Sequence, residues 1–154
     1  MAGSVDRVRG ALRDAGHDDT IVAFPASTRT AAEAAAAVGC AVAQIVKSLV
    51  FRAGERPVLV IASGANRVDT AKVSALVGTP VERPDAGWVR QVTGFAIGGV
   101  APVGHVTPPT VLIDADLAAL DPIWAAAGSP NAVFRTRFAD LVALSGATVA
   151  AIAE

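Results

Sequence analysis

Two apolar runs on either side of one glycine constrain the fold of this chain more than any other feature. Ile45 to Arg52 is rich in β-branched residues, Pro57 to Ser63 is almost entirely apolar, and Gly54 lies between them. Short runs of this kind, separated by a turn residue, predict an antiparallel hairpin. Because both runs are apolar along most of their length, we expect the hairpin to lie at the centre of a sheet.

The rest of the chain mixes helical and extended patterns without strict alternation. This mixture predicts an α/β fold of the α+β type: a compact single domain over residues 1–154, with a central mixed, partly antiparallel sheet surrounded by helices. Apolar spacing and capping residues predict helices at 4–15, 30–38, 69–77, 85–92 and 137–144. Further strands are predicted at 20–24, 110–114 and 132–135, and a helical turn at 121–127.

Composition excludes several classes of protein. With 53% hydrophobic and 18% charged residues the 154-residue chain is too apolar for disorder, and it shows neither a signal-peptide pattern nor a long apolar span. We therefore expect a soluble, cytoplasmic protein without membrane contact. The single Cys40 excludes an internal disulfide, and the two distant histidines exclude a histidine-rich metal site, so we expect no metal and no cofactor.

Charge limits how the chain can meet nucleic acid. A net charge of −1 argues against a protein that holds nucleic acid by charge alone. It leaves room for a protein that contacts only the end of a tRNA.

Lys47 is the first candidate for a functional residue. In a strand it shares one face with Leu49 and Phe51, while Ser48 points to the other face. A lysine on an apolar face loses hydration unless it reaches a partner or a cavity, and such positions are enriched at functional sites. The alternative is an edge-strand lysine that extends into water.

The second candidate is the glycine-rich stretch from Thr93 to His105. Gly98, Gly99 and Gly104 surround Pro102 there, and glycines let backbone N–H groups approach a ligand closely. Such donors can bind a carbonyl oxygen that acquires negative charge. A tight connection between strands explains the same residues, and His105 is interpreted either as a substrate contact or as a surface imidazole.

Four segments occur in an order and at a spacing that resemble a known family. Together they resemble the YbaK/EbsC family, also called the aminoacyl-tRNA synthetase-associated domain, and the resemblance runs from about residue 5 to the end of the chain. The family includes the freestanding ProX-type deacylases and the insertion domain of bacterial prolyl-tRNA synthetase. The segments are residues 30–51, 93–105, 110–114 and 123–134, and the lysine of IVKSLVF with the GG-x-x-P-x-G loop is the most specific part.

The resemblance implies a sheet that frames a pocket for an aminoacyl group and the 3′-terminal adenosine of a tRNA. Lys47 stands at the position of the family's essential lysine, and Gly98 and Gly99 stand in the loop that handles the ester carbonyl. Ser48 is expected to place a water or the ribose. The other residues expected to contact substrate are Thr30, Val100, Pro102, Gly104, His105, Ala126 and Asn131.

Three positions depart from the branch of the family that clears cysteinyl-tRNA. Ala126 and Val133 stand where that branch has a serine and an aspartate, and Thr30 stands where it tends to have an aromatic residue. These departures argue against specificity for cysteine and make a different small amino acid a candidate, while the identity of the amino acid stays open. Asn131 is the polar residue that remains nearby, and it is a candidate for reading the substrate.

The function expected from these residues is hydrolysis of a mischarged aminoacyl-tRNA in trans. The partners would be the 3′ end of an aminoacyl-tRNA and, as an open possibility, a synthetase; no oligomeric state is predicted. Two alternatives remain: a non-catalytic module that binds tRNA or a synthetase, and a hydrolase of another small ester or amide. The direction of Lys47, into a cavity beside the Gly98–Gly99 backbone or outward into solvent, discriminates between site-based functions and a surface role.

Overall fold

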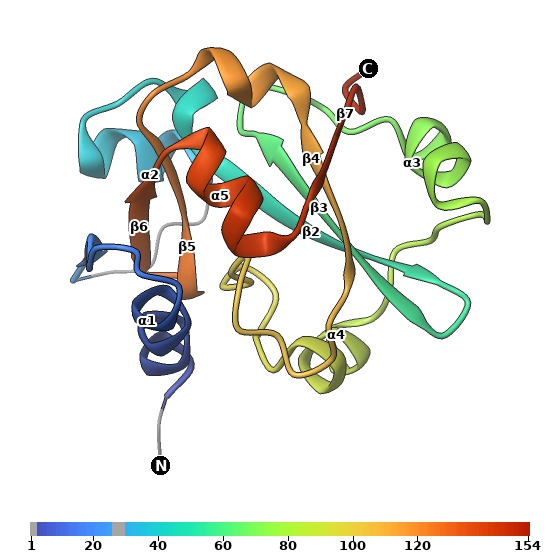
Figure 1. The fold of residues 1–154 in the computed structure, drawn as a ribbon, viewed down its shortest axis with the longest axis horizontal. Helices are drawn as coiled ribbons and strands as arrows, with labels where there is room; N and C mark the ends of the chain where they lie inside the picture. Colours follow the sequence, from blue (N-terminus) through green and yellow to red (C-terminus); the bar gives the residue numbers. More distant parts are fainter. Residues whose placement is uncertain (1–2, 26–29) are drawn as a thin grey trace.

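The computed structural model describes residues 3–25 and 30–154, which form two sheets with helices around them (Figure 1). The larger sheet has the order β2-β3-β4-β7. β2 and β3 pair antiparallel, whereas β3–β4 and β4–β7 pair parallel, so this sheet is mixed. Its strands are β2 (Val46–Ala53), β3 (Arg56–Ser63), β4 (Thr110–Asp114) and β7 (Thr148–Ala150).

The smaller sheet is antiparallel and has the order β1-β6-β5. A single parallel bridge between Ile45 and Trp124 joins it to the entrance of β2. The edge of β2 therefore faces β5 across the junction of the two sheets. The strands are β1 (Ile21–Ala23), β5 (Ile123–Ser129) and β6 (Ala132–Thr136).

Helices surround the sheets, as Figure 1 shows, with α1 packed against β5. Most begin and end where the sequence predicts, because Thr30, Asp69 and Asp85 each accept a hydrogen bond from a backbone N–H of the first turn. The helices are α1 (Ser4–Asp14), α2 (Ala31–Val38), α3 (Thr70–Val77), α4 (Ala86–Thr93) and α5 (Phe138–Ser145). Two short 3₁₀ helices are η1 (Val42–Gln44) and η2 (Ala115–Ala119).

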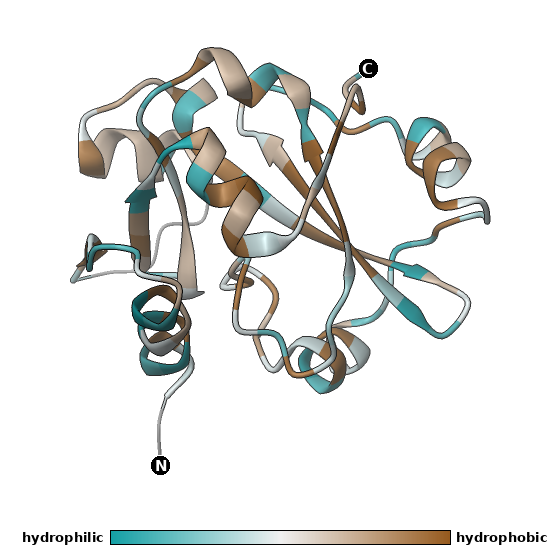
Figure 2. Cartoon of the chain, viewed as in Figure 1, coloured by the Kyte–Doolittle hydropathy of each residue, from teal (hydrophilic) through white to brown (hydrophobic). Residues whose placement is uncertain are grey.

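The core lies on both faces of β3, whose residues from Val58 to Ala62 are fully buried. Figure 2 shows this strand and β4 as the continuous hydrophobic band through the middle of the molecule. Leu59 and Ile61 belong to the larger apolar cluster, and Val58 and Val60 to a smaller one on the opposite face. None of the helices in residues 3–25 and 30–154 has the length and hydrophobicity needed to cross a membrane.

The predicted fold class is confirmed, two local expectations are wrong, and one strand was not anticipated. Residues 121–127 contain no helical turn: β5 begins at Ile123, and its buried residues Ile123, Ala125 and Ala127 alternate as a strand requires. The 3₁₀ turn η2 lies earlier. β3 is an inner strand, but β2 is an edge strand and not a central one, and β7 was not predicted.

Candidate functional site

A cavity of about 450 Å³ follows the free edge of β2. Its walls come from α2, from the loop after α4, and from the two strands β5 and β6. It therefore lies at the junction of the two sheets. The predicted site residues that line it are Thr30, Lys47, Ser48, Gly98, Val100 and Ala126.

A second cavity, of about 530 Å³, opens between the loop before β1 and helix α5. His17, Arg135 and Arg137 are among the residues that line it, and no predicted site residue does. Arg137 pairs with Asp121 across this cavity, with 3.4 Å between Nη2 and Oδ2. We place the candidate site at the β2 cavity, because the lysine and the glycine loop meet there.

Lys47 is half-buried on β2 and lines the cavity. As predicted, it shares a strand face with Leu49 and Phe51, which pack in the smaller apolar cluster. Its Nζ donates a hydrogen bond to the backbone carbonyl oxygen of Asn66 at 2.5 Å. Lys47 thus has a fixed partner beside the cavity, in contrast to a lysine that extends freely into water.

Ser48, the next residue, points to the other face of β2. Its Oγ is buried and has no hydrogen-bond partner within the described residues. A buried hydroxyl without a partner is uncommon in a native protein. In the wall of a cavity, such a group is suited to bind a polar atom of a ligand.

A tight turn brings the glycine loop to the cavity. The Gly99 N–H donates to the Ala96 carbonyl oxygen at 3.0 Å, and Gly98, third of the four residues, has a φ of 92°. A positive φ at this position is what a type II turn requires, and glycine adopts it without strain. The turn occupies the Gly99 N–H, and Ile97, Gly98 and Val100 of this segment line the cavity.

Gly99 has a second structural reason to be a glycine. A Cβ atom at Gly99 would lie 2.9 Å from the Ser129 Cα, closer than real side chains come. The loop therefore rests directly on the end of β5. Gly99 itself does not line the cavity.

The second half of the glycine stretch lies elsewhere. Pro102, Gly104 and His105 do not line the cavity. Arg7 of α1 donates to the Gly104 carbonyl at 2.8 Å and to the Gly94 carbonyl at 2.9 Å. Its guanidinium also lies 4.5 Å from the centre of the Phe95 ring. These contacts hold both ends of the stretch, at Gly94–Phe95 and at Gly104, against helix α1.

His105 is held inside this packed region. Its Nε2 lies 2.6 Å from the Ala101 carbonyl oxygen, and its ring meets that of Phe95 edge to face at 5.3 Å. Burial lowers the pKa of His105, the hydrogen bond to Ala101 acts in the opposite direction, and the charge of Arg7 lowers the pKa further. The imidazole is therefore neutral near pH 7, and it is neither on the surface nor in the cavity wall.

Asn131 also lies outside the cavity wall. Its Nδ2 donates to the Phe24 carbonyl at 3.1 Å, and its Oδ1 accepts a hydrogen bond from Ser129 Oγ. The first bond joins the β5–β6 turn to the residue that follows β1, and the second lies within the turn. The contacts of Asn131 are thus with the protein, while the neighbouring Ser129 lines the cavity.

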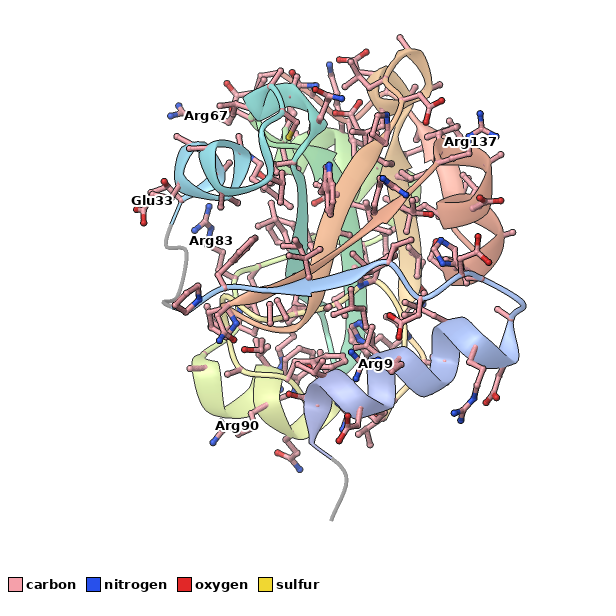
Figure 3. All side chains as sticks on the ribbon, turned by 90° about the vertical axis from the view of Figure 1, so that its left-hand side faces the viewer. Arg9, Glu33, Arg67, Arg83, Arg90 and Arg137 are labelled. Atoms are coloured by element: carbon pink, nitrogen blue, oxygen red, sulfur yellow. The ribbon has the colours of Figure 1, made fainter. Side chains whose placement is uncertain are left out.

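Several cavity residues were missed by the sequence analysis, among them an aromatic and a charged side chain. Trp124 lies in the wall from β5, and Arg83 lies near the start of α4. Arg83 is exposed and forms no hydrogen bond or ion pair within the described residues. Figure 3 shows it beside α2, on the opposite flank from Arg137. Nothing in the local sequence distinguishes Arg83 from the other arginines, because only the fold places it at the cavity.

In residues 3–25 and 30–154, no three His, Cys, Asp or Glu side chains gather where they could hold a metal ion. The polar groups that the cavity offers are instead a lysine, a hydroxyl, backbone donors and an arginine. All of these suit a negatively charged or carbonyl-bearing ligand.

Comparison with known proteins agrees with this arrangement. Residues 25–144 match the model of the aminoacyl-tRNA editing domain. A solved structure described as a candidate trans-editing enzyme for prolyl tRNA synthetase is 49% identical, with a TM-score of 0.94 over 100% of this chain and 99% of that one. The uncharacterized protein YwhH of Bacillus subtilis (strain 168) is 30% identical over 129 residues, 83% of this chain and 82% of the relative. The chain belongs to the aminoacyl-tRNA editing domain family.

Proposed function

We propose that this protein is an aminoacyl-tRNA deacylase that removes a small, wrongly attached amino acid in trans. The observation that carries the proposal is the meeting of Lys47 with the Gly98 turn in one cavity. Membership of the editing-domain family supports the same activity. The substrate bond is the ester between the amino acid and the 3′-terminal ribose of the tRNA.

The reaction needs few groups from the protein. A water adds to the ester carbonyl carbon and gives up a proton to solvent, and negative charge gathers on the carbonyl oxygen. The N–H groups of Gly98 and Val100 stabilise this oxyanion. The bond to the ribose oxygen then breaks, that oxygen takes up a proton, and free amino acid and tRNA with an intact 3′ end leave.

Lys47 supplies positive charge at this step. An ammonium group has three N–H donors, and one of them is used by Asn66. The others face the substrate, where they stabilise the developing charge or bind the ribose–phosphate end. The unpaired hydroxyl of Ser48 orients the water or a ribose hydroxyl.

Small side chains set the size of the amino acid. Ala31, Ala34, Ala126, Ala132 and Val133 line the cavity together with larger apolar side chains such as Trp124. One methylene group changes binding by only about 1–3 kcal/mol, so an editing site is best served by excluding side chains that are too large. We expect a small, uncharged amino acid, because none of these wall residues offers a partner for a charge.

Arg83, in the cavity wall, gives the tRNA a further contact. Its exposed guanidinium, which has no partner within residues 3–25 and 30–154, is suited to a phosphate near the 3′ end. The net charge of −1 implies that few phosphates are contacted, so binding should be modest and should weaken with salt. Selectivity for one tRNA then comes from a partner, for which a synthetase is the proposed candidate, and the cytoplasm is the expected place of action.

The test is a deacylation panel with tRNAs carrying alanine, serine, threonine, cysteine or proline. The wild-type protein should hydrolyse one or two of them, and Lys47→Ala should lower the rate about 100-fold or more, the size of effect seen when one oxyanion donor is removed. Lys72→Ala is the matched control, since Lys72 Nζ binds the Ala153 carbonyl at 2.7 Å, away from the cavity. It should keep the wild-type rate.

The alternative is a module that binds tRNA without hydrolysis. Family membership does not favour it, because the family is one of editing domains. Filter binding of the same charged tRNAs separates the two functions. Retained binding with no hydrolysis of any tested tRNA would replace the deacylase proposal with this module.

A further inference from the structure

The ammonium group of Lys47 is held by the main chain of a distant turn. Its hydrogen bond goes to the carbonyl oxygen of Asn66, 19 residues further along the chain, in the turn that follows β3. The place of the ammonium group in the cavity therefore depends on what holds this turn.

Two carboxylates hold Asn66 by its side chain. Its Nδ2 donates to Asp114 Oδ2 at 2.7 Å and to Asp116 Oδ2 at 2.9 Å. Asp114 is 1% exposed, and its other oxygen accepts the Asp116 backbone N–H at 3.0 Å. A buried carboxylate with both oxygens bonded is a fixed acceptor, because losing a partner would leave a buried charge unsatisfied. The Asn66 amide is thereby tied to the end of β4.

The start of the same turn is held by close packing. The Gly64 N–H donates to the Ile45 carbonyl at 2.6 Å, and Ser63 Oγ donates to the Ala43 carbonyl at 2.7 Å. A Cβ at Gly64 would lie 2.7 Å from the Val42 carbonyl oxygen. The start of the turn therefore packs against the segment that leads into β2. The Asn66 side chain holds the other end of the turn.

We propose that Asn66 is a positioning residue for Lys47. Through Asp114 and Asp116 it keeps its own carbonyl where Lys47 Nζ binds, and this directs the ammonium group along the cavity. None of these three residues lines the cavity, so they act on the reaction only through Lys47. This inference rests on the proposed role of Lys47 in ester hydrolysis.

The first test compares Asn66→Ala with the wild type in steady-state deacylation. A misplacement of about 1 Å can cost about 100-fold in rate, so we expect kcat to fall by about 10- to 100-fold. KM should change little, because no substrate contact is removed. The control is Asp69→Ala, which removes the cap of α3 three residues further along and should lower stability with kcat preserved.

A reciprocal exchange tests the hydrogen bond itself. Asn66→Asp places a carboxylate against Asp114 and should lower kcat at least as much as Asn66→Ala. Adding Asp114→Asn restores a donor–acceptor pair in the reverse direction, and the double variant should recover part of the lost kcat. Absence of any recovery, with both variants folded, would argue against positioning through this bond.

The direction of Lys47 can also be observed without catalysis. Lys47 and Lys72 are the only lysines, so reductive ¹³C-methylation gives two lysine signals, which Lys47→Arg assigns. Asn66→Ala should shift the Lys47 signal and leave that of Lys72 in place. An unshifted Lys47 signal together with an unchanged kcat would overturn the positioning role.

The two proposals fail in different ways. A wild-type protein that hydrolyses no charged tRNA would remove the deacylase proposal, and the methyl signal alone would then decide whether Asn66 positions Lys47. An active wild type that Lys47→Ala inactivates and Asn66→Ala does not would remove only the positioning role.

Discussion

The two halves of the glycine stretch differ in what they do, although they are continuous in the sequence. In the first half, residues 96–99 form a type II turn, and Ile97, Gly98 and Val100 line the cavity. The second half, Pro102 to His105, packs against α1 and is held by Arg7. A glycine-rich motif can therefore divide within a few residues into a part that lines a cavity and a part that packs against a helix.

The two interpretations of the motif concern the same few residues, and the role in catalysis stays a proposal. Gly98 and Gly99 are required by local geometry, one by its φ and one by the contact with Ser129. The same geometry places Gly98 in the cavity wall. A structural need for glycine and a role in the site are therefore compatible.

Among the substitutions that test the difference between the two halves, Gly99→Ala should have the largest effect on activity. The added Cβ would collide with the Ser129 backbone, and the turn must then lift away from β5 and carry the Gly98 and Val100 donors with it. We expect a loss of about 100-fold in kcat/KM, as for a misplaced oxyanion donor. Deacylation kinetics on the substrate found in the panel measure this loss.

Gly87→Ala is the matched control for this substitution. A Cβ at Gly87 would meet only Asp85 Oδ1, at 3.4 Å, and the residue lies inside α4. Alanine favours a helix over glycine by about 1 kcal/mol, so this variant should be at least as stable as the wild type and equally active. Equal activity of Gly99→Ala and Gly87→Ala would show that the activity does not depend on the close contact of the turn with β5.

Arg7→Ala should have the next largest effect, and on stability. It removes two hydrogen bonds to loop carbonyls and a cation–π contact with Phe95, which together should lower the free energy of unfolding by about 2 kcal/mol. kcat should be preserved where the variant is folded, because Gly94, Phe95 and Gly104, the residues that Arg7 contacts, do not line the cavity. Urea unfolding and deacylation rates give the two quantities.

Arg9→Ala lies on the same helix and serves as the comparison. Arg9 pairs with Asp6 and Asp19 on the surface, at 3.4 and 3.0 Å, and such pairs contribute little. If Arg7→Ala were no less stable than Arg9→Ala but much less active, the second half of the loop would belong to the site after all.

The smallest effect concerns the pH dependence of stability. In the unfolded chain His105 takes up a proton near pH 6.5, whereas burial lowers its pKa in the folded protein. At pH values between the folded and the unfolded pKa, the unfolded state binds more protons than the folded state. The free energy of unfolding is therefore highest above about pH 6.5 and decreases as the pH is lowered from there. His105→Gln should flatten this dependence, as measured by urea midpoints at pH 5.5 and 7.5; identical profiles for both proteins would contradict the assignment.

Much of the fold follows from short-range patterns. The hairpin of β2 and β3, the strand β4 and the helix caps at Thr30, Asp69 and Asp85 are all set by residues close in sequence. β5 was misassigned because alanines, which favour helices, fill a strand whose shape is set by pairing with β6. The edge position of β2 depends on strand order, which local patterns do not contain.

The candidate site likewise contains residues that local patterns predict and residues that only the fold brings together. Lys47 was accessible from the sequence, since an isolated lysine on an apolar strand face needs a partner. The partner itself, Asn66, and the arginine at the cavity mouth, Arg83, are brought there by the fold, and nothing in their neighbours marks them. His105 was predicted to lie at the site because it is close to Gly98 in the sequence. The tight turn in this stretch means that closeness in sequence does not place His105 at the cavity.

The close packing around Gly64 has a consequence for any attempt to change the amino acid selectivity of the protein. A Cβ at Gly64 would lie 3.0 Å from the Ala31 Cβ, and Ala31 also lines the cavity. A larger residue at Ala31 would therefore press on the turn that carries Asn66, so altered selectivity and lost activity would arrive together. Ala126, on the opposite wall, has no such coupling to that turn. Redesign of the amino acid preference should begin there.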